Sequence, residues 1–387
     1  MRSDMIPERK FYFHSIDGLR LFAAMNVVLF HYQSDGGFYN MGGEPVWFFN
    51  IIKGPAFHAS LFFILSGFIF TMKYLPHYKT FEHKKFLLSR FRDLYPLHVG
   101  TTCAMAVLKL IASDSVNLQK MAYSVFIHLS FLYAFIPFNT YGLNRPSWAL
   151  SAFVLCYIML PVLLRLVYKI RKRRYTVLLM ALCLVPGVVW WIIYSNFVND
   201  PSFYQFYHSF GFIRIFEFII GMLMARHFMI SYCVRSKKSE GIKRGRLEAV
   251  FFDSLILLSF AMIYFSIVFR DETRPLYNKL SYHVFLIVPF VLLLASLARE
   301  RGIVPKFFAL PAVRLMGQSS FYPYLLHVPL MSWFCWILSR FFGYKKFLHS
   351  PLNVFVFIVM LYAISCLYWN IVRKKKRKRY KPEKRAE

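Results

Sequence analysis

The chain has 387 residues, of which 58% are hydrophobic and 20% aromatic, and its formal net charge is +30. Soluble domains are typically about 45–50% apolar, so this composition excludes an ordinary soluble domain. A high positive charge is typical of nucleic-acid-binding proteins. Here, however, Lys and Arg occur in short runs between apolar blocks, as in membrane proteins with basic inner loops. We therefore expect membrane lipids, and no nucleic acid, as partners of these basic runs.

Eleven apolar blocks follow one another, most of them close to the length of about 20 residues that spans a bilayer. The first block ends at His31-Tyr32-Gln33-Ser34, which is not a small-residue cleavage site. It therefore predicts an uncleaved span and not a signal peptide. The blocks cover residues 16–34, 55–75, 95–112, 121–137, 149–168, 176–194, 209–228, 249–268, 280–298, 319–338 and 351–372.

The charges of the loops predict how many of these blocks cross the membrane. The loops 76–94 and 169–174 are both basic and should both face the cytoplasm. An even number of spans must then separate them, whereas three blocks lie between them. The block 121–137 is short and ends in a polar turn, so we interpret it as a re-entrant or interfacial segment on the outer side. The sequence thus predicts an all-α polytopic membrane protein with about ten transmembrane helices and both termini in the cytoplasm.

We expect residues 1–387 to form a single membrane domain, with spans over roughly 16–372 and a basic cytoplasmic tail at 373–387. The cysteines lie far apart, nearly all within apolar blocks, and have no metal-ligand spacing. We interpret them as small hydrophobic residues and predict no metal site.

Polar side chains inside apolar blocks are costly and mark candidate functional positions. Arg20 and His31 lie 11 residues apart in the first block, which places them on one helix face and about 16 Å apart along its axis. Snorkelling of both side chains toward the headgroups explains this spacing equally well. Arg214 and Glu217 are three residues apart in the block 209–228 and predict an ion pair, whose usual role is packing.

Six short motifs occur in order along nearly the whole chain. They are Ile16-Asp17-Gly18-Leu19-Arg20 with His31 following, Phe62 to Phe68, Arg90 to Pro96, Trp148-Ala149-Leu150-Ser151, Arg214 to Ala225, and Ser319 to Pro329. Each motif alone is weak, but six in this order resemble acyltransferase family three. The members of this family are membrane-bound enzymes that O-acylate bacterial surface and secreted glycans.

The resemblance implies a role for each matching position. His31 would be the general base, and Arg20 would contact substrate or cofactor. The basic motif, here Arg90 and Arg92, would contact the phosphates of coenzyme A. The remaining motif residues expected to support the site are Trp148, Ser151, Arg214, Glu217, Tyr324 and His327. No metal and no permanently bound cofactor are expected, and acetyl-CoA or succinyl-CoA would be the donor substrate.

The chain departs from the family pattern at two positions. The family's basic motif has two arginines separated by two residues, and here Asp93 stands in the second place, next to Arg92. The family also has a glutamate two residues after the serine of its Trp-Ser-Leu-Ser motif, and this position is Phe153. If that glutamate assists catalysis, this chain needs a substitute or has an altered or lost activity.

The sequence therefore predicts an O-acyltransferase of the bacterial cytoplasmic (inner) membrane. It would move an acyl group from cytoplasmic acyl-CoA to a hydroxyl of a cell-surface or secreted glycan or glycolipid. One alternative is a transporter of a glycan or lipid-linked intermediate, against which the ordered motifs and the lack of an evident inverted repeat argue. The other is a non-catalytic partner in polysaccharide assembly, which Phe153 suggests.

Aromatic residues of the expected outer segments could stack on the sugar rings of an acceptor, although an interfacial aromatic belt explains most of them. These residues are Tyr39, Trp47, Tyr141, Trp148 and Tyr204.

Overall fold

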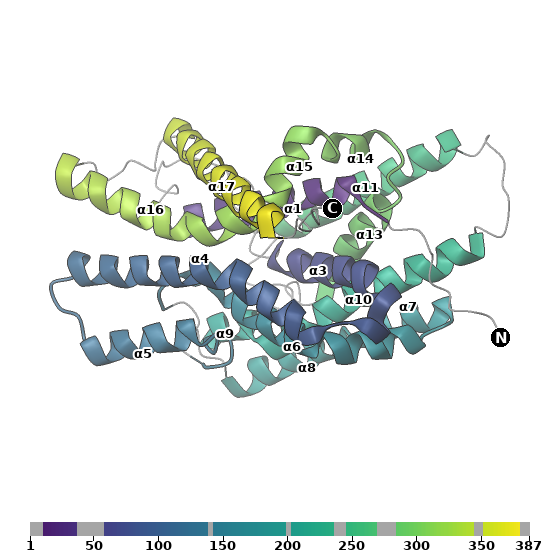
Figure 1. Ribbon diagram of the computed structural model, residues 1–387, viewed down its shortest axis with the longest axis horizontal. Helices are drawn as coiled ribbons and strands as arrows, with labels where there is room; N and C mark the ends of the chain where they lie inside the picture. The colour runs from purple at the N-terminus through teal and green to yellow at the C-terminus, as the bar shows by residue number, and fades with distance from the viewer. Residues whose placement is uncertain are drawn as a thin grey trace, which may run out of the picture.

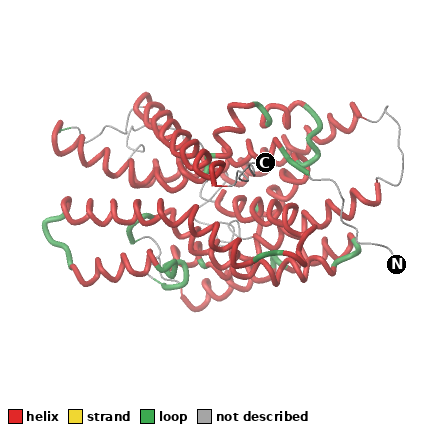
Figure 2. The backbone as a smooth tube through the Cα atoms, viewed as in Figure 1, coloured by secondary structure: helices red, strands yellow, loops and turns green. Residues whose placement is uncertain are grey.

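The computed structural model describes residues 11–36, 58–137, 142–198, 203–235, 245–268, 284–343 and 351–379. Within these residues all regular structure is helical, as Figures 1 and 2 show. This confirms the predicted all-α class. It also fits a lipid environment, where a helix satisfies its backbone groups without water.

The helices follow the order of the apolar blocks. The first half of the chain forms α1 (His14–Gly36), α3 (His58–Tyr74), η2 (Leu75–Thr80), α4 (His83–Ala112), α5 (Leu118–Leu129), η3 (Arg145–Ser147) and α6 (Trp148–Lys169). The middle forms α7 (Arg173–Leu182), α8 (Val185–Ile193), η4 (Tyr194–Val198), α9 (Tyr204–Ser209), α10 (Gly211–Arg235) and α11 (Gly245–Val268). The last part forms α13 (Ile287–Leu297), α14 (Ile303–Phe308), α15 (Pro311–Gln318), α16 (Phe321–Phe342) and α17 (Pro351–Arg379).

Seven helices in the described part of the chain are long and apolar enough to cross a membrane. They cover Ala59–Thr80, His83–Ala112, Arg145–Lys169, Arg173–Asn196, Gly245–Val268, Phe321–Phe342 and Leu352–Lys374. Large apolar side chains on α7, α11 and α17 are exposed, such as Leu178, Leu257 and Val356. Exposed apolar helix faces of this kind need lipid around them. The chain is therefore a polytopic integral membrane protein.

Three of the ten predicted spans are not among these seven. The first, α1, has 23 residues but includes Asp17 and Arg20, and α10 has 25 residues but includes Arg214 and Glu217. The third, α13, is an apolar helix of 11 residues. The number of crossings and the sides of the termini therefore stay predictions.

The block 121–137 forms α5 and a turn. With 12 residues, α5 is about 18 Å long, which is shorter than the hydrocarbon core of about 30 Å. It lies beside α4 in Figure 1. This length agrees with our interpretation that the block does not cross the membrane.

The expected loop 76–94 is mostly helical, and this part of the prediction was wrong. The 3₁₀ helix η2 and the first turns of α4, which begins at His83, occupy most of it. Arg90 and Arg92 therefore lie on a helix and not on a loop. Since α4 continues to Ala112, it has 30 residues and includes Pro96 in its interior.

The centre of the fold is the contact between α3 and α10, with α6 packed against α10. Gly67 and Gly221 lie at this contact. A Cβ atom on Gly67 would overlap the carbonyl oxygen of Phe218, and one on Gly221 would overlap that of Ile64. Glycines at such positions let two membrane helices approach closely. The phenylalanine motif of α3 and the Arg214 motif of α10 are thus joined backbone to backbone.

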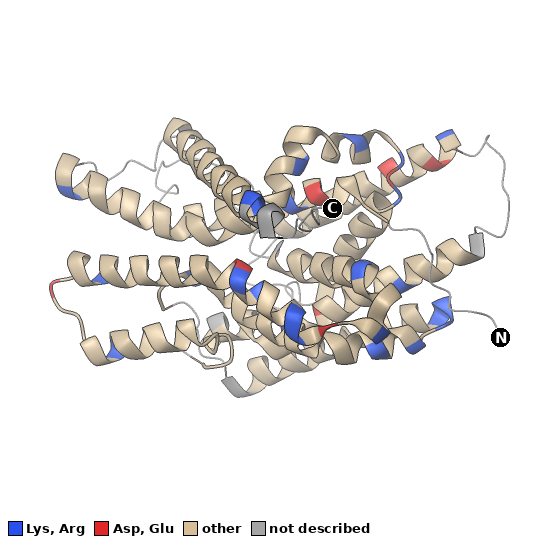
Figure 3. Ribbon diagram, in the orientation of Figure 1, with Lys and Arg blue, Asp and Glu red and all other residues tan. Residues whose placement is uncertain are grey.

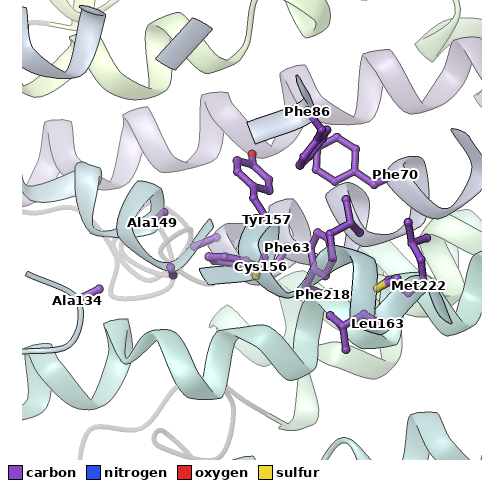
Figure 4. Packing of buried hydrophobic residues seen from close by; sticks show 14 of the residues in the cluster. Phe63, Phe70, Phe86, Ala134, Ala149, Cys156, Tyr157, Leu163, Phe218 and Met222 are labelled. Carbon is purple, nitrogen blue, oxygen red and sulfur yellow. The ribbon is translucent and has the colours of Figure 1, made fainter. Parts of the chain in front are cut away.

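Aromatic and aliphatic side chains fill the space around this contact, as Figure 4 shows. Phe70, Phe86 and Tyr157 come from α3, α4 and α6 and pack edge to face, with ring centroids 5.6–5.7 Å apart. This cluster connects α4, which carries Arg90, to α3 and α6.

Candidate active site

The first helix places its two candidate residues in different surroundings. Arg20, near the start of α1, is partly exposed, and its charge interacts with Arg90 of α4 and Tyr157 of α6. His31, near the other end of α1, is buried and contacts His327 of α16. The predicted face of α1 therefore joins two sites, one around an arginine and one around a histidine.

His31 and His327 form a buried pair of imidazoles. Their ring centroids are 4.9 Å apart and their planes are tilted by 54°. Nδ1 of His31 lies 3.0 Å from the carbonyl oxygen of Val27, and Nδ1 of His327 lies 2.9 Å from that of Pro323. A carbonyl oxygen only accepts, so each Nδ1 carries the proton and Nε2 of each neutral ring is the basic nitrogen. This is the nitrogen that a general base would use.

Tyr324 connects this pair to the segment before α6. Its hydroxyl donates a hydrogen bond to the carbonyl oxygen of Pro146 at 2.9 Å. Its ring packs against Phe62 of α3 at 5.6 Å and against His327 at 6.3 Å. Three of the predicted motifs therefore meet beside the histidine pair.

Arg90 lies among aromatic rings at the other site. Its guanidinium group is 5.0 Å from the ring centroid of Phe70 and 5.2 Å from that of Phe86. Its Nε atom is buried and has no hydrogen-bond partner among the described residues. Aromatic faces stabilise the cation and leave the donors of the guanidinium available for an anion.

Arg92 is not part of this cluster. It is exposed, and because it follows Arg90 by two residues on α4, it projects about 200° around the helix from Arg90. Arg20 of α1 lies within electrostatic range of Arg90. Asp93, one turn after Arg90, interacts electrostatically with Tyr157 and Tyr322.

Arg20 is positioned by the start of α1. Its Nη1 atom is 3.8 Å from Oδ1 of Asp17. Oδ2 of Asp17 accepts hydrogen bonds from the Tyr12 hydroxyl at 2.5 Å and from Nε2 of Gln318 at 2.9 Å. Asp17 is thus fixed between α1 and the end of α15, which restricts the Arg20 side chain.

Arg214 and Glu217 form the predicted ion pair, with Nη1 2.6 Å from Oε1. Arg214 also donates to the Ser60 hydroxyl at 2.7 Å and to the carbonyl oxygen of His208 at 2.9 Å. The Ser60 hydroxyl donates in turn to Glu217 at 3.0 Å. The guanidinium lies over the ring of Trp148, 5.2 Å from its centroid. This buried network ties α3, α6 and α10 together, which favours a structural role.

Ser151 also has structural contacts. Its hydroxyl donates to the carbonyl oxygen of Phe131 and accepts a hydrogen bond from the backbone N–H of Ala134 at 3.4 Å. Phe131 has a positive φ of 58°, so the turn after α5 contains a residue in a left-handed conformation. Ser151 fixes this turn against α6.

Phe153 occupies the position of the family's glutamate. Its ring stacks on Phe63 at 4.2 Å and on Tyr157 at 5.9 Å. The position is therefore part of the aromatic core, and no carboxylate group is present at this point.

The structure adds contributors that the sequence analysis missed. Tyr12 and Gln318 bind Asp17, the ion-pair partner of Arg20, but in the sequence they look like ordinary loop or helix residues. Of the predicted aromatic residues, Tyr39, Trp47 and Tyr141 lie outside the described residues, and for Tyr204 only the backbone, in α9, is described.

Comparisons with known proteins show the family to which the chain belongs. The sequence model of acyltransferase family 3, described as an acyltransferase domain, matches residues 13–370 of this chain. The chain is 25% identical over 370 residues to the putative peptidoglycan O-acetyltransferase YrhL of Bacillus subtilis, covering 90% of this chain and 53% of that protein. It is 23% identical over 338 residues to the peptidoglycan O-acetyltransferase OatA of Listeria monocytogenes, covering 83% and 50%.

A shorter similarity, 29% identity over 175 residues, relates it to the acyltransferase MdmB of Streptomyces mycarofaciens, covering 44% of this chain and 43% of that protein. The chain thus spans about half the length of these curated relatives. No solved structure matches it. Because the family match covers nearly all the helices described above, the chain belongs to acyltransferase family three.

Proposed function

We propose that the protein transfers an acyl group, acetyl or succinyl, from cytoplasmic acyl-CoA to a hydroxyl of a cell-surface or secreted glycan. The observation that carries this proposal is the contact of His31 in α1 with His327 in α16, two buried imidazoles from two of the family's motifs. Relatives named as peptidoglycan O-acetyltransferases make a glycan hydroxyl the first acceptor to test.

Arg20 and Arg90 would bind the phosphates of the donor. The charges of Arg20 and Arg90 repel each other, and an anion bound near both would lower this repulsion. Arginine–phosphate contacts are charge-assisted and can be bidentate. Asp17 would hold Arg20 in place for this contact. Arg92, on the far side of α4, could at most attract the donor at a distance.

His31 would act as the general base at the other end of this face. Its Nε2 atom takes the proton of the acceptor hydroxyl while the oxygen attacks the thioester carbonyl carbon. The C–S bond then breaks, the acyl group stays on the acceptor oxygen, and the coenzyme A thiolate takes the proton from His31. The neighbouring ring of His327 would orient His31 and the acceptor.

The activity is tested with purified protein in lipid nanodiscs, acetyl-CoA or succinyl-CoA, and soluble peptidoglycan fragments. The readouts are the release of coenzyme A thiol and the mass of the acylated sugar. We expect turnover by the unchanged protein, and a loss of at least about 100-fold in His31→Ala, the usual contribution of general-base catalysis.

His77, which is exposed and lies in η2, provides the matched control. His77→Ala should keep its activity. Acylation at the unchanged rate in His31→Ala would contradict the role of His31. No turnover with any donor and acceptor would contradict the enzymatic function and favour a transport or assembly role.

A further inference from the structure

The ion pair of Asp17 and Arg20, one turn apart on α1, is longer than a hydrogen bond. The distance of 3.8 Å between Oδ1 of Asp17 and Nη1 of Arg20 exceeds the usual N–H···O distance of about 2.7–3.2 Å. In the described part of the chain, Arg20 donates no hydrogen bond, and 30% of its side chain is exposed. Asp17 therefore orients Arg20 through its charge, while the N–H donors of Arg20 stay open to a ligand.

The other carboxylate oxygen of Asp17 is held by two donors. Oδ2 accepts hydrogen bonds from the Tyr12 hydroxyl at 2.5 Å and from Nε2 of Gln318 at 2.9 Å. Nε2 of Gln318 also donates to the Tyr12 hydroxyl at 3.1 Å. Because a carboxylate only accepts, the amide nitrogen of Gln318 and not its oxygen must face Asp17. Tyr12, Asp17 and Gln318 thus form a closed triangle of hydrogen bonds, which we call the Asp17 clamp.

Close backbone contacts fix the elements that carry this clamp. A Cβ atom on Gly317, directly before Gln318 in α15, would overlap the carbonyl oxygen of Asp17. A Cβ atom on Gly18 of α1 would overlap the carbonyl oxygen of Phe308 in α14. Such backbone contacts leave little freedom to the side chains beside them. The start of α1 and the two helices α14 and α15 therefore hold Gln318 at a fixed place beside Asp17.

An Asp17 carboxylate released from the clamp would compete with an anionic ligand for Arg20. Arginine and a carboxylate readily form a bidentate pair with two short hydrogen bonds. The clamp prevents this pair, because its two donors occupy Oδ2 of Asp17. Without them, both oxygens could turn to Arg20, which is the only ion-pair partner of Asp17 in the described residues. The clamp therefore decides whether the donors of Arg20 go to Asp17 or to a ligand.

We propose that Tyr12 and Gln318 are positioning residues, which restrain Asp17 and so leave the guanidinium group of Arg20 open for a phosphate of the acyl donor. This inference deepens the proposed function and rests on it, since Arg20 is the residue proposed there to bind a donor phosphate. Tyr12 and Gln318 act through Asp17 and need not touch the donor. Loss of either residue's hydrogen bond should weaken donor binding, and removal of the Asp17 charge should then restore it.

The test measures the binding of coenzyme A, without an acyl group or an acceptor, so that it does not depend on catalysis. Isothermal titration calorimetry uses the full chain in phosphatidylcholine nanodiscs. The variants are Tyr12→Phe, Gln318→Met, Asp17→Asn and the double variant Gln318→Met/Asp17→Asn. Gln119→Met, at an exposed position of α5, is the matched control. Size-exclusion chromatography checks that each variant is folded.

We expect Tyr12→Phe and Gln318→Met each to raise the Kd for coenzyme A about tenfold, as the loss of one charge-assisted hydrogen bond to a phosphate would. Gln119→Met should bind like the unchanged protein. The double variant should bind as tightly as Asp17→Asn and more tightly than Gln318→Met, because no carboxylate is left to compete. A merely structural role of Gln318 would make the double variant at least as weak as Gln318→Met. In acyl transfer, Gln318→Met should raise the KM for acyl-CoA and leave kcat unchanged.

Unchanged binding in both Tyr12→Phe and Gln318→Met, or a double variant that binds no more tightly than Gln318→Met, would overturn the inference. No binding of coenzyme A to the unchanged protein would overturn it together with the proposed donor site. The expected pattern of binding without acyl transfer from any donor would support the clamp and contradict the proposed reaction. Acyl transfer with the same KM for acyl-CoA in all variants would leave the reaction and overturn the clamp.

Discussion

Helix geometry decides which of the predicted side chains can act together. Arg90 and Arg92 are close in sequence, but on α4 they point to different sides, and only Arg90 lies over Phe70 and Phe86. Arg20 is 70 residues away in sequence, and its charge nevertheless interacts with that of Arg90. We therefore expect a donor phosphate site to depend on Arg20 and Arg90 more than on Arg92.

Alanine substitutions can separate the two residues of the basic motif. A hydrogen bond to a charged group contributes about 1.5–3 kcal/mol, so Arg90→Ala should raise the KM for acyl-CoA at least about tenfold. Arg92→Ala should change it less than about threefold, because Arg92 is exposed. Steady-state kinetics with varied acyl-CoA measures both values. An equal or larger effect of Arg92→Ala, or a fall in kcat alone for Arg90→Ala, would contradict this assignment.

The sequence predicts the site residues unequally well. Arg20 and His31 can be found because a charge and an imidazole inside an apolar block are rare. Tyr157 cannot, since a tyrosine in an apolar helix is usually a core residue. The segment 142–147 looks like an ordinary loop, and its hydrogen bonds to α4, α5 and α16 join helices that are far apart in the sequence. Long-range packing of this kind leaves no local sequence pattern.

Close helix contacts determine the architecture at the scale of the elements. Gly67 of α3 and Gly221 of α10 each lie against a carbonyl group of the other helix. Larger residues there must move a backbone and not a flexible side chain.

Gly67→Leu should therefore lower the melting temperature of the protein or prevent its isolation as a single species. Overpacking usually lowers the free energy of unfolding by about 1–3 kcal/mol and occasionally by more. We expect a loss near the upper end of this range, because the new side chain would collide with a backbone carbonyl group. The control is Gly100→Leu in α4, where a Cβ atom meets nothing within 4 Å. Thermal unfolding in detergent compares the two. Equal stability would argue against the α3–α10 contact.

The network of Arg214, Glu217 and Ser60 allows a second stability prediction. Removal of one member of a buried ion pair costs about 3–5 kcal/mol, because the other charge stays buried. Arg214→Met should be strongly destabilised, whereas the double variant Arg214→Met/Glu217→Gln should recover part of the loss. Arg340→Met, at an exposed position of α16, is the control. Unfolding curves of the unchanged protein and of these three variants measure the differences in stability. An unchanged stability of Arg214→Met would contradict a structural role of the ion pair.

Element boundaries are predicted less well than element positions. Ten apolar blocks and the short α5 can be located from hydropathy, but the first turns of α4 contain Lys84, Lys85, Arg90 and Arg92 and therefore look like a loop. Tertiary contacts of Phe86 and Arg90 stabilise these turns. The block 176–194 likewise divides into α7 and α8, and Pro186 lies at the start of α8.

Lys and Arg are distributed unevenly along the molecule, and this predicts its orientation in the membrane. Figure 3 shows that most of the Lys and Arg positions of the described helices lie toward the end where α7 begins, with fewer near the α4–α5 connection. The positive-inside rule assigns the basic end to the cytoplasm. The candidate donor site around Arg90 would then open toward the donor, and the histidine pair would lie nearer the outer side.

Reporter fusions test this orientation. A fluorescent protein after residue 387 and one inserted at residues 171–172 should fold and fluoresce, because both positions are expected in the cytoplasm. Alkaline phosphatase inserted at residues 114–115, between α4 and α5, should be active, because it would be exported. An inactive phosphatase at this position, or a dark reporter at residue 387, would contradict the predicted topology.

The most direct test of the whole account is mass spectrometry of surface and secreted glycans from bacteria that produce the unchanged protein, His31→Ala, His77→Ala or none. We predict that one fixed acyl mass is present with the unchanged protein and with His77→Ala. It should be absent without the protein and with His31→Ala produced at the same level. If His31→Ala restores the acyl mass fully, His31 is not the general base. If the glycans carry the same acyl groups with and without the protein, the account of a glycan O-acyltransferase is contradicted.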